Sequence, residues 1–326
     1  MHRLSAFLAA ALLGCALQAT AEEIAVGNYG VSANGMPFGV ALAKGYFRDE
    51  GINVTGLISS AGGGTSLRNM LAGGGVPYGE VNPGVVVSAI LAGADLKIVS
   101  DNVLTVAEFV WAVKPDSPIR TIKNLKGKKI GYTNPRSTSQ ALARMLLQIA
   151  GYQPDDAELV KTGGFGEGIA ALDSGLVDVV PITEPLWSKL KSKYRAVVVA
   201  SDVLPPLDNV VGVATLEMME KRGDFIRAVI RARRKAVQFM KEHPDEAGDI
   251  VAKQYNLEPE VARAAVRTLT TSSTKGVPYW GDGEIHLEGL KRMIEAQRSV
   301  GAITGEVDYG KIIDTRFLPD DLKAVK

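Results

Sequence analysis

The sequence predicts an α/β fold of two lobes joined by a two-strand hinge, with a helical C-terminal region. From Glu23 onward, short apolar segments alternate with helical patterns, which is typical of βαβ units and mainly parallel sheets. One strand–turn–helix pattern occurs twice, as expected for two lobes of similar construction. The length of 326 residues also suits two domains of ordinary size.

The first segment, residues 1–21, has the pattern of a secretory signal peptide. A basic start at Met1-His2-Arg3 precedes an Ala- and Leu-rich stretch, and Ala19-Thr20-Ala21 forms a small-x-small cleavage site. The apolar stretch is shorter than the roughly 20 residues that a membrane-spanning helix needs. The sequence therefore predicts export to the periplasm.

The cysteine content adds one alternative and several exclusions. Cys15 is the only cysteine, and Leu12-Leu13-Gly14-Cys15 is loosely similar to a lipoprotein processing site. A lipid anchor on Cys15 is therefore the alternative to a soluble periplasmic protein. If cleavage follows Ala21, the mature chain has no thiol, which excludes a cysteine nucleophile, a disulfide and a cysteine-ligated metal.

The charge balance argues against nucleic acid as a partner. The chain has 37 basic and 36 acidic residues, a net charge of +1, and 46% hydrophobic residues, as in a soluble globular protein. Apolar residues at helical spacing surround one basic run, so we expect that run to form the solvent-facing side of an amphipathic helix. The run comprises Arg231, Arg233, Arg234 and Lys235.

Turn residues place the individual elements. A helix that begins at Pro37 should end at Lys44-Gly45, because a cation in the last turn followed by glycine is a typical helix stop. Gly62-Gly63-Gly64 should precede another helix. The first two strands are expected at 24–26 and 52–58, and the C-terminal helices at 225–241, 244–255, 258–269 and 287–300, packed on lobe one.

The repeated unit runs from a helix end through glycine into a short strand. Residues 71–80 are followed by Asn82-Pro83, and residues 172–180 are followed by Glu184-Pro185. In both copies we expect the polar residue at the N-cap and proline at the first helical position, where its missing N–H costs nothing.

The strands at 109–113 and 209–214 are the expected hinge, because each lies between the two repeated lobes and follows or precedes prolines. Lobe one is then predicted to comprise residues 22–112 plus about 210–326, and lobe two residues 113–209.

The strand-to-helix turns are the candidate ligand contacts. In open α/β sheets, ligands bind beyond the carboxyl ends of the strands, where helix N-termini offer unpaired N–H groups and partial positive charge. The residues that these turns present are Gly63, Gly64, Thr65, Asn82, Asn134, Arg136, Ser137, Thr138, Ser139 and Glu184. Ser137 and Gln140 form a capping box that should start the second of these helices. Glu80 and Glu184 leave room for a ligand amine, and Tyr29 and Trp187 are candidate aromatic contacts, although each of these side chains could instead serve packing or capping.

The chemistry of catalysis is largely missing. His243 precedes a proline at a helix end, His286 stands apart, and no His, Glu or Cys spacing matches a metal site. No Gly-x-Ser-x-Gly sequence is present either. We therefore expect a binding protein without cofactor or metal rather than an enzyme.

Five segments stand in a specific order and spacing along the chain. They are Pro37–Phe47 with Glu50-Gly51-Ile52, Leu91–Val99, Leu125–Gly131, Gly175–Asp178 and His243–Ala247. Together, over nearly the whole mature chain, they resemble a known family, the ABC-importer periplasmic substrate-binding proteins for aliphatic sulfonates, taurine, nitrate and thiamine-precursor pyrimidines.

The resemblance implies a type II periplasmic-binding-protein fold whose lobes close around one ligand. It also implies an inner-membrane permease partner with a cytoplasmic ATPase, and a pocket that includes Asn28 and Tyr29. A monomer that captures a small organic anion or zwitterion is the first hypothesis. A neutral pyrimidine-like heterocycle as ligand, an exported enzyme, and a ligand sensor for a signalling partner are the alternatives.

Overall fold

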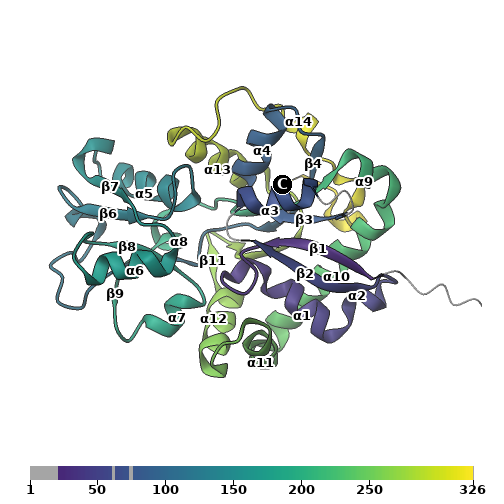
Figure 1. The fold of residues 1–326 in the computed structure, drawn as a ribbon, viewed down its shortest axis with the longest axis horizontal. Helices are drawn as coiled ribbons and strands as arrows, with labels where there is room; N and C mark the ends of the chain where they lie inside the picture. Colours follow the sequence, from purple (N-terminus) through teal and green to yellow (C-terminus); the bar gives the residue numbers. More distant parts are fainter. Residues whose placement is uncertain (1–20, 61–62, 73–75, 326) are drawn as a thin grey trace, which may run out of the picture.

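The computed structural model describes residues 21–60, 63–72 and 76–325, and it contains two α/β lobes side by side (Figure 1). Residues 1–20 of the predicted signal peptide, which include Cys15, lie outside the described residues, as does Gly62. In Figure 1 the second lobe, drawn in teal, lies to the left of the first. This arrangement confirms the predicted fold class.

The sheet of the first lobe, within the described residues, has six strands in the order β13-β4-β10-β3-β1-β2. β1 runs parallel to β2 and β3, and β10 runs antiparallel to β3 and β4. The strands are β1 (Glu22–Gly27), β2 (Val54–Ser60), β3 (Gly79–Val81), β4 (Leu96–Val103), β10 (Val210–Thr215) and β13 (Trp280–Gly283). Because β1, β2 and β3 are parallel, their carboxyl ends meet at one edge of the sheet.

The helices of the first lobe cover both faces of this sheet and bury its apolar side chains. The stop at Gly45 is confirmed, since α1 ends at Lys44 and Gly45 takes the left-handed conformation with φ 78°. These helices are α1 (Met36–Lys44), α2 (Tyr46–Asp49), α3 (Gly63–Ala72), α4 (Pro83–Leu91), α9 (Leu216–Lys221), α10 (Gly223–Glu242), α11 (Pro244–Tyr255) and α14 (Tyr309–Ile312).

The second lobe is built around the central strand β5, which pairs antiparallel with β8 and β9. β6 pairs parallel with β7, and a parallel bridge from Ile130 to Val179 links β6 to the start of β8. The strands are β5 (Phe109–Val113), β6 (Lys129–Tyr132), β7 (Glu158–Lys161), β8 (Val180–Thr183) and β9 (Arg195–Val199). The helices are α5 (Thr138–Ile149), α6 (Phe165–Asp173), α7 (Leu186–Leu190) and α8 (Ala200–Val203).

The chain crosses between the two sheets twice, through residues 104–108 and 204–209. The strand that was expected to form the hinge, 109–113, lies just after the first crossing, because Phe109–Val113 is the central strand of the second sheet. Likewise, Val210–Thr215 is paired inside the first sheet. Both expected hinge strands are thus sheet strands, because their apolar residues gain partners on both sides, and the connections are the polar segments beside them.

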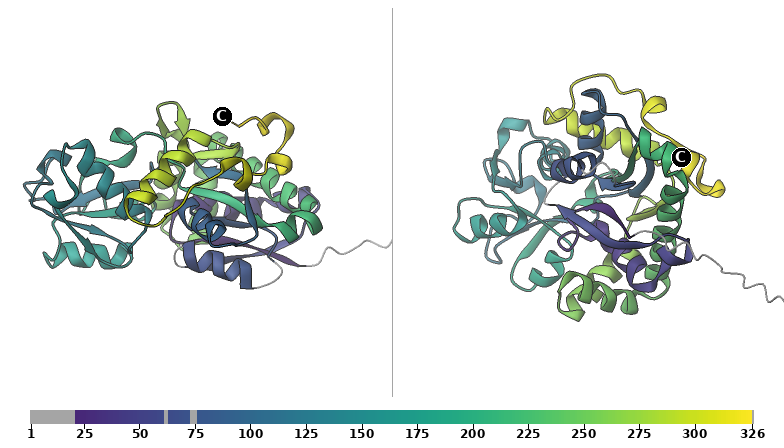
Figure 2. Two further views of the ribbon diagram at one scale, coloured as in Figure 1. Left: turned by 90° about the horizontal axis from the view of Figure 1, so that it is seen from above. Right: turned by 45° about the vertical axis from the view of Figure 1, so that its right-hand side comes forward.

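The C-terminal helices pack on the first lobe, and two of them also contact the second. α13 (Leu287–Ser299) contacts both α4 and α5, and α12 (Pro259–Thr271) contacts α7. Leu290 and Ile294 of α13 lie in the core of the first lobe, whereas Met293 lies in the core of the second. Figures 1 and 2 show the yellow-green C-terminal segment starting between the lobes and ending over the first one. The small strands β11 (Ser273–Thr274) and β12 (Val277–Pro278) form a hairpin beside it.

One member of the basic run is buried, so the expectation of a fully solvent-facing run is wrong. Arg233 is 1% exposed and donates to the carbonyls of Gly281 (2.7 Å) and Asn102 (2.6 Å). Its Nε lies 3.7 Å from a carboxylate oxygen of Glu80. Helical periodicity places Arg233 on the inner face of α10, and no local sequence signal predicted that the buried carboxylate of Glu80 lies opposite it.

Candidate ligand-binding site

The predicted turns lie at the facing edges of the two sheets. The turns after β1, β2 and β3 come from the carboxyl edge of the first sheet, and those after β6, β7 and β8 from the corresponding edge of the second. The two edges meet where Asn82 Nδ2 donates to Thr138 Oγ1 across 2.7 Å. This hydrogen bond joins the N-terminus of α4 in one lobe to that of α5 in the other.

The start of α4 is as the sequence predicted. Asn82 is the N-cap residue, its side-chain oxygen accepts from the Gly84 N–H (2.9 Å), and Pro83 is the first helical residue. The amide group of Asn82 is thereby oriented with its nitrogen toward the second lobe. Besides Thr138, this nitrogen donates to the carbonyl oxygen of Asn209 (3.1 Å).

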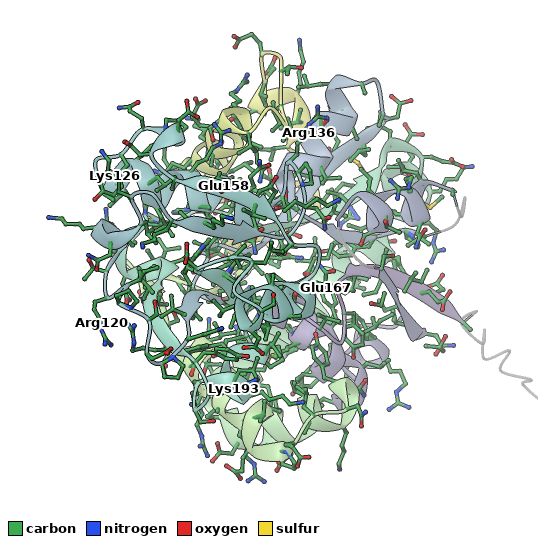
Figure 3. All side chains as sticks on the ribbon, turned by 60° about the vertical axis from the view of Figure 1, so that its left-hand side comes forward. Arg120, Lys126, Arg136, Glu158, Glu167 and Lys193 are labelled. Carbon is green, nitrogen blue, oxygen red and sulfur yellow. The ribbon has the colours of Figure 1, made fainter. Side chains whose placement is uncertain are left out.

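The start of α5 differs from the predicted capping box in one respect. Ser137 Oγ accepts from the Gln140 N–H (3.3 Å), as expected, but Gln140 Oε1 accepts from the N–H of Arg136 (2.7 Å) rather than of Ser137. The reason is that Arg136 takes a left-handed conformation with φ 64°, which directs its N–H toward the helix. The side chains of Asn134 and Arg136 are exposed, and Arg136 projects from this turn in Figure 3.

The side chain of Ser139 forms hydrogen bonds within the β6–α5 turn. Its hydroxyl oxygen accepts from the Thr133 N–H (3.0 Å) and hydrogen-bonds to Thr133 Oγ1 and Ser137 Oγ, each at 2.9 Å. Ser139 is buried, so its side chain organises the β6–α5 turn. Thr138, at the first helical position, is the residue of this turn that contacts the first lobe.

The turns after β1 and β2 are tied to each other. The N–H of Asn28, at φ 54°, donates to the Ser60 carbonyl (2.9 Å), and Ser59 Oγ donates to the Tyr29 carbonyl (2.8 Å). In α3, Thr65 Oγ1 accepts from Arg68 (2.9 Å), and Gly64 and Thr65 are half-buried. Gly63 is the first residue of α3.

The two candidate aromatics lie against their own lobes. The Tyr29 hydroxyl donates to Gln254 Oε1 (3.0 Å), and its ring packs edge-to-face on Tyr255 with centroids 5.0 Å apart. Burial raises the pKa of Tyr29 to about 12. Trp187 is half-buried against the hydrophobic cluster around β8 and α6. Their roles in ligand contact stay predictions.

The expected free carboxylates are both engaged. Glu184 does not occupy the N-cap of α7, which is Pro185, and its carboxylate accepts from the N–H (3.0 Å) and hydroxyl (3.1 Å) of Ser188. Burial raises the pKa of Glu184, and the Ser188 donors oppose that rise. Glu80 is fully buried and accepts from Asn34 (2.9 Å) and Asn102 (2.7 Å). Neither carboxylate is therefore directed at a ligand amine, because other groups of the chain already bind it.

Sequence reasoning missed the β7–α6 turn and the crossing segments. Gly163, at φ 97°, donates its N–H to the Thr133 carbonyl (2.9 Å), and Gly164 is the N-cap of α6 without a side-chain cap. Thr162-Gly163-Gly164 between a strand and a helix was the available signal. Glu167, labelled in Figure 3, lies in the first turn of α6. Asn209 carried no comparable signal, since its contacts come only from the fold.

The described ranges contain no group of three or more His, Cys, Asp or Glu residues arranged to hold a metal ion. Among the helices described, none combines the length and apolar character needed to cross a membrane. The groups that the turns offer for recognition are amide N–H groups, hydroxyls and amide side chains.

Comparisons with known proteins agree with this geometry. A family model described as NMT1/THI5 like matches residues 32–247. A Bacillus subtilis (strain 168) protein named as aliphatic sulfonates-binding is 24% identical over 311 residues, covering 90% of this chain and 87% of that protein. The riboflavin-binding protein RibY of Chloroflexus aurantiacus is 23% identical, covering 87% of this chain and 82% of that protein.

Solved structures share the fold. The periplasmic aliphatic sulphonate binding protein SsuA of Escherichia coli superposes with a TM-score of 0.74 at 20% identity, covering 90% of this chain and 92% of that one. The desulfurization enzyme DSZB superposes with a TM-score of 0.65 at 15% identity, covering 91% and 97%. The same two-lobed architecture thus occurs in binding proteins and in an enzyme.

Proposed function

The chain belongs to the NMT1/THI5-like family, and from this premise we propose that it is the extracytoplasmic solute-binding protein of an ABC importer. The observation that carries the proposal is the Asn82–Thr138 hydrogen bond, which brings together helix N-termini from both lobes. A ligand held there would contact both lobes at once, so it would favour the closed arrangement over an open one.

The proposed ligand is a small organic anion such as a sulfonate. Helix N-termini stabilise negative charge through unpaired N–H groups and the helix dipole. Arg136 adds an exposed cation at the β6–α5 turn. Glu80 and Glu184 are engaged elsewhere, so an anion is favoured over a zwitterion whose amine would need a carboxylate. The names of the relatives from Bacillus subtilis and Escherichia coli support the same ligand class.

The proposed setting is the periplasm, with a permease and its ATPase as partners. The signal-peptide pattern of residues 1–21 supports export, and the relatives' names support a periplasmic binding role. The balanced net charge of +1 supports a small solute rather than nucleic acid as the ligand, and the proposed state is a monomer. Capture without turnover is part of the proposal.

A neutral heterocycle is the second candidate ligand. The relative from Chloroflexus aurantiacus is named riboflavin-binding, and it covers most of this chain. Half-buried aromatic side chains such as Trp187 could stack on such a ring. An enzyme remains the rival class, because the fold is shared with a desulfurization enzyme.

A thermal-shift screen separates these candidates. Ethanesulfonate, taurine, nitrate, a pyrimidine and riboflavin are each added at saturating concentration. A ligand at about a hundred times its Kd adds about 2.7 kcal/mol to the free energy of unfolding, which raises Tm. Stabilisation by ethanesulfonate supports an organic anion as the ligand. Stabilisation by riboflavin alone supports the second candidate, a neutral heterocycle.

Matched controls complete the screen. Arg136→Gln should weaken the effect of ethanesulfonate, whereas Arg120→Gln, an exposed cation elsewhere on the second lobe (Figure 3), should leave it unchanged. Mass spectrometry of the incubated ligand then shows whether it is recovered intact. Chemical conversion of the ligand, or no stabilisation by any compound, would remove the assignment as a solute-binding protein.

A further inference from the structure

A buried hydrogen bond joins the two segments that cross between the lobes. Asn209 Nδ2, in the second crossing, donates to Glu108 Oε1, in the first crossing, across 2.5 Å. Glu108 is 3% exposed and Asn209 is 9% exposed. This pair therefore fixes the spacing of the two connections at the point where any rotation of the lobes must act.

Asn209 extends this pair to both helix N-termini. Its carbonyl oxygen accepts from Asn82 Nδ2 (3.1 Å), and its Oδ1 accepts from Thr138 Oγ1 (3.3 Å). Asn82 caps α4 and Thr138 opens α5. A continuous chain of hydrogen bonds thus runs from Glu108 through Asn209 to the starts of both helices.

We propose that Glu108, acting through Asn209, is a positioning residue that holds the N-termini of α4 and α5 in the ligand-receiving arrangement. The expected effect of Glu108 on ligand affinity rests on the proposed function. Its effect on the distance between the lobes does not, and that distance can be measured without a ligand.

The surroundings of Glu108 keep it uncharged near neutral pH. Burial raises the pKa of Glu108 to about 8, although Asn209 and the Tyr279 hydroxyl oppose that rise. Within the described residues, Glu108 Oε2 has no hydrogen-bond partner, and no Lys or Arg forms an ion pair with this carboxyl group. The N–H of Glu184, the residue after β8, donates to the Glu108 carbonyl (3.1 Å), which brings a second buried acid close in space to this contact.

Two more acids lie beside the second crossing. Asp208 precedes Asn209, and burial raises its pKa to about 8; Asp101 of β4 faces it, and burial and Asp208 raise its pKa as well. His286 Nδ1 lies 3.5 Å from Asp208 Oδ1. A pH-dependent change in lobe separation or ligand affinity could come from either Glu108 or Asp208. Substituting each residue separately shows which of the two is responsible.

The sign of the pH effect follows from burial. As the pH rises through about 8, Glu108 loses its proton and becomes a buried charge without a cation. An open arrangement that lets water reach the carboxylate lowers its pKa, so ionisation favours the open arrangement. Ligand affinity should then fall with rising pH, by at most about tenfold per pH unit for one proton.

Titration calorimetry with ethanesulfonate from pH 6.5 to 9 tests this, because a sulfonate keeps its charge throughout. Wild type should lose affinity across the upper half of the range. Glu108→Gln keeps a neutral acceptor for Asn209, so its affinity should be nearly constant with pH and far above that of Glu108→Ala. Asp208→Asn should retain the fall. An identical fall in wild type and Glu108→Gln, or equal affinities of the Gln and Ala variants, would overturn the proposal.

Ligand-free protein gives an answer even if no sulfonate binds. Spin labels at Arg120→Cys and Lys253→Cys, exposed positions on the two lobes, report the lobe separation in a Cys15→Ser background. The separation in wild type should increase between pH 7 and 9, and that in Glu108→Gln should not. If sulfonate binding is absent but this difference appears, only the ligand assignment fails. No change in wild type would refute the positioning role.

Discussion

The molecule contains two buried acidic sites that differ in how their charge is met. In the first lobe, Glu80 lies beside Arg233 and accepts hydrogen bonds from Asn34 and Asn102. Beside the second crossing, Asp101 and Asp208 face each other, and no Lys or Arg of the described residues forms an ion pair with either. His286 Nδ1 lies 3.5 Å from Asp208, and burial raises the pKa of Asp208 although the more distant charge of Arg292 opposes that rise. Both sites are nearly inaccessible to water.

The difference shows that burial alone does not decide what a carboxyl group does. Burial raises the pKa of Glu80, but the Arg233 charge and two amide donors oppose that rise. Among the described residues, Asp101 Oδ1 and both oxygens of Asp208 have no hydrogen-bond donor, and a proton on one of the two facing carboxyl groups relieves their repulsion. We therefore expect the first site to stabilise the sheet of the first lobe. We expect the second site, which lies beside the crossing segments, to respond to pH.

Loss of the cation in the first site should have the largest effect. Arg233→Met leaves Glu80 buried and without its opposite charge, so we expect the free energy of unfolding to fall by about 3–5 kcal/mol. Urea denaturation at pH 7 measures this. Arg227→Met, on the same helix but pairing with exposed Asp224, is the control and should lose far less. Equal losses would show that Glu80 does not depend on Arg233.

Removal of a titrating acid from the second site should change the slope of stability against pH. Asp208 keeps its proton up to about pH 8 when folded, whereas the unfolded chain releases it near pH 4. The folded state therefore binds more protons in this window, and stability falls as the pH rises, by at most about 1.4 kcal/mol per pH unit. Asp208→Asn should flatten the decline in unfolding free energy measured at pH 5, 6 and 7. If the slope of unfolding free energy against pH is unaltered in Asp208→Asn, groups other than Asp208 bind the extra protons of the folded state.

Glu184 offers an intermediate case, with two hydrogen-bond donors from Ser188 and the charge of Lys191 acting on it without an ion-pair contact within the described residues. Ser188→Ala removes the hydroxyl that donates to Glu184 across 3.1 Å and leaves the Ser188 N–H donor in place. We expect a loss of about 1 kcal/mol in the free energy of unfolding. Ser192→Ala, at an exposed position just beyond the same helix, should have no effect. Should both variants behave alike, the hydroxyl contributes nothing to the buried carboxylate.

An exposed ion pair should contribute least to the free energy of unfolding among the charged groups compared. Lys221 and Glu217 are one helical turn apart at 2.7 Å, with both side chains more than half exposed. Water screens this pair, so Lys221→Ala should leave the denaturation midpoint within experimental error of wild type. A clear loss there would mean that accessible charges matter in this protein as much as buried ones.

Much of the fold could be predicted because local signals and the fold agreed. The stop at Gly45, the Asn82 cap with Pro83, and the start of α11 at Pro244 each depend on residues close in sequence. The site was predicted less completely. Asn82 and Thr138 were proposed as ligand contacts from their turns, and the structure places them in contact with each other. Glu108 and Asn209 were not proposed, because their contact joins residues about a hundred positions apart.

The sequence by itself determined the class of elements, their order and the polar turns, since these depend on periodicity and on caps within a few residues. Only the tertiary structure decided which polar residues are engaged. Arg233 could have faced water and Glu80 a ligand, yet the packing of α10 on the first sheet brings them together. The physical reason is that a buried charge is stable only beside partners, and those partners come from distant parts of the chain.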